Sequence, residues 1–196
     1  MSPLPTKEDC DALGLIALPA EAALLHDRAH APPRLRAHHS LVHDVAHRLI
    51  AMLAERLPPL PFDADLVRFG AATHDLGKAL VPEELSHPGS RHEALGYEWM
   101  LAQGLPHRLA RFAMTHASWD GTVALEDLLV AAADKIWKGS RVDALEMRLT
   151  DAIAAAAGLG RWQAFAALDG AFDVLADDAA TRLAWQARFA IQARPE

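Results

Sequence analysis

The sequence predicts an all-α protein that folds as a single domain. Alanine is abundant and β-branched residues are sparse outside short runs, a composition that favours helix nearly throughout. No segment alternates apolar and polar residues as a half-buried strand would. A chain of 196 residues is long enough for one domain with a full core, or for one domain with a small appendage. Because no linker, internal repeat or low-complexity tail divides the chain, we expect residues 1–196 to form one helical bundle.

Proline and glycine mark where the expected helices begin and end. Residues 1–19 should form an irregular lead-in with one short helix. The apolar side chains of the long helix that follows recur at three- and four-residue steps, at Leu41, Val45, Leu49, Met52 and Leu53. Farther on, Ser90 and Glu93 are spaced as an N-cap and its capping-box partner. The expected helices cover 20–30, 34–57, 63–73, 90–103, 106–117, 122–137 and 141–157, with one or two more before Ala193.

The helix expected over 63–73 leads to the most informative stretch of the chain. Its apolar residues are spread around most of its circumference, so we expect it to be buried rather than amphipathic. Asp63 suits its N-cap and Gly77 suits its C-terminal stop. His74 and Asp75 stand side by side at its end. Burying an unpaired carboxylate is costly, and a divalent metal ion suits both side chains. The sequence therefore predicts a metal-binding pair at the end of a buried helix.

Composition and charge exclude several classes of protein. A net charge of −7 argues against a general nucleic-acid surface, which needs a basic patch to neutralise phosphates. It leaves room for a small phosphorylated ligand at one local positive centre. No apolar run is long enough to span a bilayer, so no membrane association is expected. The single cysteine, Cys10, excludes an internal disulfide and suits a reducing compartment, so we expect a cytoplasmic protein.

The histidines give further candidate ligands. There are 11, and most lie in the first 116 residues. His92 and His116 each lie in a short polar segment after the His74-Asp75 pair. Asp134 follows an apolar run, where a carboxylate is either on a solvated stripe of its helix or a buried ligand. A second His-Asp dipeptide at His43 lies in mid-helix with no following glycine or lysine, and we do not expect it to bind metal.

Five motifs lie in order along the chain: RAHHS, THDLGK, RHEALG, HASWDG and AAADKI, in a core that runs from residue 34 to 138. Together they resemble the motifs of the HD superfamily of metal-dependent phosphohydrolases. THDLGK, RHEALG and HASWDG also resemble the HD-GYP subgroup, but no GYP tripeptide follows Gly121, so cyclic-dinucleotide hydrolysis is not expected. The resemblance implies an HD-type bundle. Residues 139–196 match none of these motifs and are expected to be the C-terminal helices that complete the bundle.

The resemblance also implies a set of metal ligands. His39, His74, Asp75 and Asp134 would bind one ion, and His92 and His116, with Asp75 bridging, would bind a second. Arg36 and Ser40 on either side favour His39 over its neighbour His38. Imidazole-rich ligation favours iron, manganese, cobalt, nickel or zinc over magnesium. With a single ion, magnesium or manganese stays open.

The expected function is metal-dependent hydrolysis of a small phosphate ester, nucleotides included, through a metal-bound hydroxide. Asp75 and Lys78 are the expected catalytic residues, with Lys78 neutralising charge on the phosphate or the leaving group. Asp120 and Glu93 are candidates to orient ligand histidines. Two alternatives remain open from the sequence. One is an HD-type diiron oxygenase, for which the same ligand set would serve, and the other is a non-catalytic metal- or ligand-binding signalling module.

Overall fold

The computed structural model describes residues 4–119 and 121–191, and within them every regular element is a helix. The predicted all-α fold is confirmed. In this described part of the chain, no helix combines the length and the apolar character that crossing a membrane requires. The elements are α1 (Lys7–Ala12), α2 (Ala20–Arg28), α3 (Pro33–Arg56), α4 (Ala64–Thr73), η1 (Leu76–Ala79), η2 (Pro82–Leu85), α5 (Arg91–Ala102), α6 (His107–Ala110), α7 (Phe112–Thr115), α8 (Leu125–Ile136), α9 (Asp143–Ala157), α10 (Arg161–Asp177) and α11 (Ala179–Ala187).

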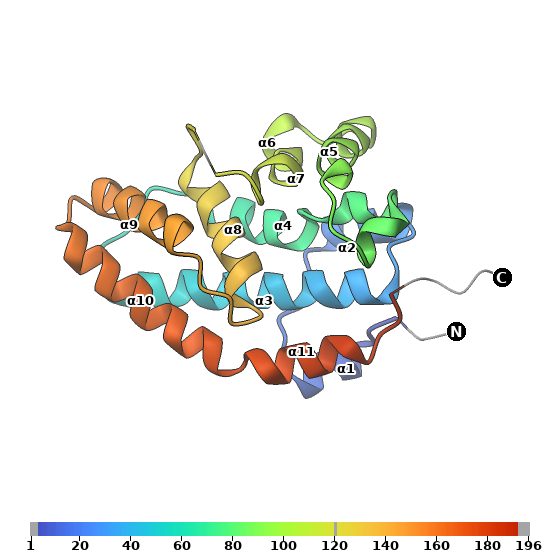
Figure 1. The fold of residues 1–196 in the computed structure, drawn as a ribbon, viewed down its shortest axis with the longest axis horizontal. Coiled ribbons are helices and arrows are strands. Elements are labelled where there is room, and N and C mark those ends of the chain that lie inside the picture. The colour runs from blue at the N-terminus through green and yellow to red at the C-terminus, as the bar shows by residue number, and fades with distance from the viewer. Residues whose placement is uncertain (1–3, 120, 192–196) are drawn as a thin grey trace.

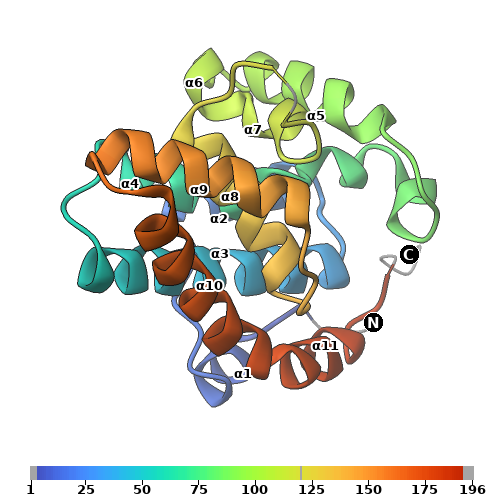
Figure 2. The ribbon, with the colours of Figure 1, turned by 60° about the vertical axis from the view of Figure 1, so that its left-hand side comes forward.

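The long helix α3 is the axis of the molecule. It lies across the centre of Figure 1, with α4 alongside it and α8 packed against both. Helices α5, α6 and α7 gather beyond α4, whereas α9 and α10 cover the opposite end, as the rotated view in Figure 2 also shows. Helix α11 returns along α3 toward the start of that helix. Helices α10 and α11 therefore pack on the same central helix as the motif-bearing core, and α9 packs on α8 and α10.

The ends of the helices agree with the sequence prediction except at the C-terminus of α4, around α5 and in the segment 106–117. The stop predicted at Gly77 is wrong, because α4 ends at Thr73 with His74 as its C-cap and Gly77 lies within η1. Asp63 caps α4 as expected, its Oδ1 accepting the backbone N–H groups of Asp65 at 3.1 Å and Leu66 at 3.0 Å. The capping box predicted for α5 is wrong, because Ser90 makes no side-chain cap bond. Glu84 from η2 takes its place, as described below. The single helix expected over 106–117 is two short helices, α6 and α7, that meet at Arg111.

A close contact between two glycines brings η1 against α5. A Cβ on Gly77 would lie 2.0 Å from the carbonyl oxygen of His92 and 2.8 Å from Cα of Gly96. A Cβ on Gly96 would in turn lie 3.0 Å from Cα of Gly77. Only glycine allows the two backbones to approach this closely. The contact places the first turn of α5, with His92, directly beside the end of α4.

Candidate metal centre

His74 and Asp75 lie where the chain leaves the buried helix α4. His74 is the C-cap of α4, and Asp75 immediately precedes η1. Both side chains are buried, with relative exposures of 0% and 4%. Because the helix ends here, the two neighbouring side chains converge on one region instead of diverging by the roughly 100° of a continuing helix.

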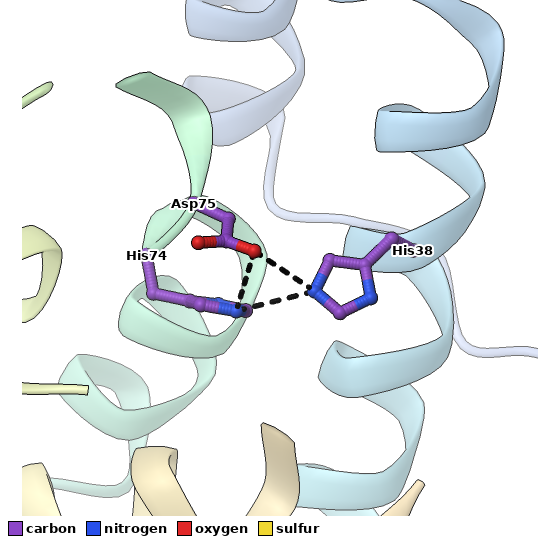
Figure 3. A group of neighbouring side chains, drawn as sticks. All are labelled: His38, His74 and Asp75. Carbon is purple, nitrogen blue, oxygen red and sulfur yellow. Dashed lines mark hydrogen bonds and ion pairs between the residues drawn. The ribbon is translucent and has the colours of Figure 1, made fainter. Parts of the chain in front are cut away.

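The first group of donor atoms lies between α3, the end of α4, and α8. His38 Nε2 is 3.2 Å from His74 Nε2 and 3.5 Å from Asp75 Oδ2, and these three side chains point toward one another in Figure 3. Asp134 on α8 completes the group, with its Oδ1 3.4 Å from His38 Nε2 and 3.5 Å from His74 Nε2. The donor atoms of His38, His74 and Asp75 thus lie within 4.8 Å of one another, and Asp134 lies beside both imidazoles.

The second group uses the other oxygen of the same aspartate. Asp75 Oδ1 lies 3.1 Å from His92 Nε2 and 3.2 Å from His116 Nε2. His92 comes from the first turn of α5, and His116 caps the end of α7. The carboxylate of Asp75 is therefore shared, with Oδ2 facing the first group and Oδ1 facing the second.

The hydrogen bonds on the far side of each imidazole determine which atoms face the centre. The Nδ1 atom of His74 lies 3.2 Å from Ala71 O, and Nδ1 of His116 lies 3.0 Å from Phe112 O. For His92, Nδ1 lies 2.6 Å from a carboxylate oxygen of Glu84. Since those oxygens only accept, each Nδ1 carries a proton, and in the neutral form of each ring Nε2 presents a lone pair toward Asp75.

This arrangement fits a cation between the donors. Asp75 Oδ1 and His92 Nε2 are buried and have no hydrogen-bond partner among the described residues, although they face each other. Buried polar atoms in native proteins are nearly always satisfied, and an unpaired one calls for an explanation such as a bound ion. Two lone-pair donors that face each other across about 3 Å repel unless positive charge lies between them. The orphaned atoms thus match the donor set of a metal site.

For His38 and Asp75, the surroundings favour the protonation states that bind metals. Burial lowers the pKa of His38 to about 3, so its imidazole is neutral near pH 7. Burial acts to raise the pKa of Asp75, but the imidazoles of His74 and His116 outweigh it and hold that pKa well below its ordinary value. Neutral imidazole and ionised carboxylate are the forms that bind metals. For His116, burial opposes the charged form, yet contact with Asp75 prevails and raises the pKa, which reflects the negative potential around Asp75.

The structure differs from the sequence prediction at the first histidine. His39 is fully buried, but its Nδ1 lies 3.0 Å from His26 Nε2 and its Nε2 accepts the backbone N–H of Asp75 at 3.3 Å. Both ring nitrogens are engaged there, and neither belongs to a donor group. His38, its neighbour, faces the first group instead. Adjacent residues on α3 point about 100° apart, and the packing of α2, which brings His26, fixes which of the two faces Asp75.

Two further side chains hold the ligands in place, and sequence reasoning missed both. Glu84 accepts the backbone N–H groups of Arg91 and His92, each at 3.1 Å, while it contacts the His92 ring. It therefore caps α5 and orients His92 at once, the role suggested for Glu93. Lys135 Nζ lies 2.7 Å from Asp134 Oδ2 and fixes that carboxylate. Lys135 is adjacent to Asp134 in the sequence, so this contact could have been predicted. No local pattern in the sequence indicated the contact of Glu84 with His92. Asp120 lies outside the described residues.

Lys78 connects the centre to solvent. Its Nζ is 2.5 Å from Asp75 Oδ2, and its side chain is about one quarter exposed. A cavity of about 250 Å³ opens at this point. It is lined by Arg34, Leu35, His38, Asp75, Lys78, Glu84, Leu85 and Gln186.

The second His-Asp dipeptide is elsewhere: Asp44 is buried against Ile16 N at 3.2 Å and Arg48 Nε at 2.7 Å. In the described residues it belongs to no donor group.

Comparison with known proteins agrees with the geometry of the site. The family model for the HD domain matches residues 36–137, slightly more than half of the chain. No curated protein and no solved structure matches the chain. The matched segment begins in α3 and ends just after α8, so it contains every residue of the two donor groups. The chain therefore belongs to the HD domain family, whose members are usually metal-dependent phosphohydrolases.

Proposed function

We propose that this protein is a metal-dependent phosphohydrolase that acts on a small phosphate ester. The observation that carries the proposal is the shared carboxylate of Asp75, whose two oxygens face two separate groups of imidazoles. Shared carboxylates of this kind suit a pair of ions, and paired ions suit displacement at phosphorus. The presence of Lys78 beside the same carboxylate favours phosphate as the group transformed.

Six side chains would hold the metal. His38, His74, Asp75 and Asp134 would hold one ion, and Asp75, His92 and His116 a second. Imidazole-rich ligation favours iron, manganese, cobalt, nickel or zinc over magnesium. With two divalent ions bound, the four imidazoles would be neutral ligands and the two carboxylates would leave the site with a charge of about +2, which would attract a phosphate in an otherwise acidic protein. A divalent ion held there would supply Lewis acidity, which polarises phosphoryl oxygens and lowers the pKa of an attacking water.

The protein's own side chains would bind the phosphate, orient a metal ligand and exclude bulk water. Lys78 has three N–H donors and uses one on Asp75, so two are left for the oxygens of a bound phosphate or of its leaving group. Glu84 holds His92 in one tautomer and one orientation. The burial of His38, His74 and Asp75 keeps bulk water from all but the cavity side, which strengthens each electrostatic contact within the site.

The proposal is tested by Asp75→Asn, which removes the charge of the shared carboxylate with little change in volume. Bound metal, measured by elemental analysis, and turnover of para-nitrophenyl phosphate should both be lost. Asp44→Asn is the matched control, because Asp44 is also a buried aspartate that follows a histidine but lies outside the donor groups. It should keep its metal. Retention of metal and turnover in Asp75→Asn would overturn the proposal.

Two other outcomes would replace the proposed function with a different one. Oxygen consumption by the iron-loaded protein without phosphatase activity would indicate a diiron oxygenase. Metal binding with neither activity would indicate a signalling module.

A further inference from the structure

Three residues outside the segment that the family model matches also border the cavity beside Asp75, namely Arg34, Leu35 and Gln186, and we call the part of its border formed by Arg34 and Gln186 the rim. Arg34 stands in the first turn of α3, and Gln186 lies near the end of α11. Both border the same cavity as His38, Asp75 and Lys78, yet the match covers only residues 36–137. Helix α11, which the sequence analysis expected only to help complete the bundle, thus contributes Gln186 to the border of the cavity.

Arg34 is held firmly at this rim by the end of α11. Its Nε donates to Phe189 O at 2.9 Å and its Nη2 donates to Ala187 O at 3.1 Å. Its backbone N–H donates to Ala190 O at 2.9 Å. A guanidinium has five N–H donors, so these bonds fix its plane and leave donors for another partner. A preorganised guanidinium is well suited to bind a carboxylate or a phosphate.

The acidic residues at the cavity already have bonding partners, whereas its two cationic side chains still have N–H donors for a ligand. Glu84 is bonded to the His92 ring and to two backbone N–H groups of α5. Asp75 contacts Lys78 and the imidazoles of both donor groups. What remains for a ligand is positive charge at two places, Lys78 beside the metal ligands and Arg34 at the rim. The cavity therefore suits a molecule with two separated anionic groups.

Resting on the proposed function, we infer that the rim selects phosphomonoesters whose leaving group carries a second anionic group. The reacting phosphate lies at the Lys78 end, and the second phosphate or carboxylate binds Arg34, next to Gln186. The cavity, at about 250 Å³, is smaller than the roughly 300–1,000 Å³ typical of ligand sites. A small dianionic or bisphosphorylated compound fits these limits better than a dinucleotide.

Binding of two non-hydrolysable phosphonates to the metal-loaded protein tests the inference without relying on turnover. The first is para-carboxybenzylphosphonate, and the second is para-carbamoylbenzylphosphonate, which has a similar shape but no distal charge. Calorimetry should give the carboxylate compound roughly tenfold tighter binding, about 1.4 kcal/mol. In Arg34→Gln the two compounds should bind equally.

Because Arg34 also clamps the end of α11, a second series keeps the test valid if Arg34→Gln does not fold. Gln186→Lys should increase the preference for the carboxylate compound, and Gln186→Glu should reduce it. The matched controls are Ala184→Lys and Ala184→Glu, which place the same charges on an exposed position of α11 that does not border the cavity. They should leave the preference unchanged.

Equal binding of the two phosphonates by the wild type, with no response to the charge at position 186, would overturn the inference. Hydrolysis of para-nitrophenyl phosphate would still support the proposed function in that case. Failure of both phosphonates to bind, together with no hydrolysis of para-nitrophenyl phosphate, would overturn the proposed function and the inference with it.

Discussion

Substituting Gly77 by alanine should separate the two donor groups of the metal centre. A Cβ at this position would lie 2.0 Å from the carbonyl oxygen of His92 and 2.8 Å from both N and Cα of Gly96. All three atoms belong to the backbone of the helix α5, so no side-chain rotation relieves the overlap. To reach ordinary contact distances, η1 and α5 must move apart by more than 1 Å.

The cost of this movement follows from the packing. Adding a methyl group to a close-packed contact costs about 1–3 kcal/mol. For a protein of 196 residues, 1 kcal/mol corresponds to about 2–4 °C in Tm, so a decrease of about 2–12 °C is expected. The displacement carries His92 away from Asp75 Oδ1, whereas His38 and Asp134 sit on other helices. The second donor group should therefore weaken while the first is kept.

Scanning calorimetry and a metal titration measure these two effects. Gly170→Ala is the matched control, because Gly170 lies within α10 and a Cβ there would meet no atom within 4 Å. It should leave metal binding unchanged and should stabilise the helix by about 0.4–1 kcal/mol. Equal Tm values and equal metal binding for Gly77→Ala and Gly170→Ala would refute this account of the glycine contact.

Three further perturbations test the assignment of individual side chains. Loss of a residue that only orients a metal ligand usually reduces metal affinity by roughly 10- to 100-fold. His38→Ala removes a proposed ligand and should reduce the affinity by more than this, whereas His39→Ala should stay within this range. Glu84→Gln removes the charge that orients His92 and should reduce metal affinity by roughly 10- to 100-fold, as a metal titration would measure. Stability should fall in acid, because burial lowers the pKa of His43 from 6.5 to about 4. Between those values the unfolded chain binds a proton that the folded protein does not, so the free energy of unfolding decreases by up to roughly 3 kcal/mol as the pH falls. Urea unfolding at pH 7 and pH 4 would show this loss, and His43→Gln should reduce it.

Each of these predictions has a clear contrary result. A greater loss of metal in His39→Ala than in His38→Ala would reverse the assignment of the first histidine. Wild-type affinity in Glu84→Gln would show that His92 needs no carboxylate partner. A wild-type protein whose free energy of unfolding is the same at both pH values would show that burial does not keep His43 neutral.

The helices could be predicted from the sequence because the patterns that indicate them are local. Asp63 caps α4 from the adjacent residue, and the apolar periodicity of α3 needs no knowledge of its neighbours. The His74-Asp75 pair was also recognisable, since it ends an apolar helix and is followed by glycine and lysine. These features depend on residues within about one helical turn of each other.

The parts that could not be predicted depend on contacts between distant segments. His38 and His39 are both buried, and only the packing of α2 against the end of α4, through His26, determines which one faces Asp75. Glu84 reaches His92 across a turn, where no spacing rule applies, and the nearer Glu93 was a plausible but incorrect choice for the cap. The position of α11 beside the cavity could not be predicted from the sequence either, because residues 139–196 carry none of the motifs.

The central claim is that one carboxylate, that of Asp75, holds metal through both of its oxygens. Anomalous diffraction from crystals grown with Mn²⁺ tests it most directly. The account predicts anomalous density against Asp75 Oδ2 with His38 and His74, and against Asp75 Oδ1 with His92 and His116, the two ions about 3.5–4 Å apart. Density that lies away from Asp75, or an ion bound by His39 in place of His38, would contradict it.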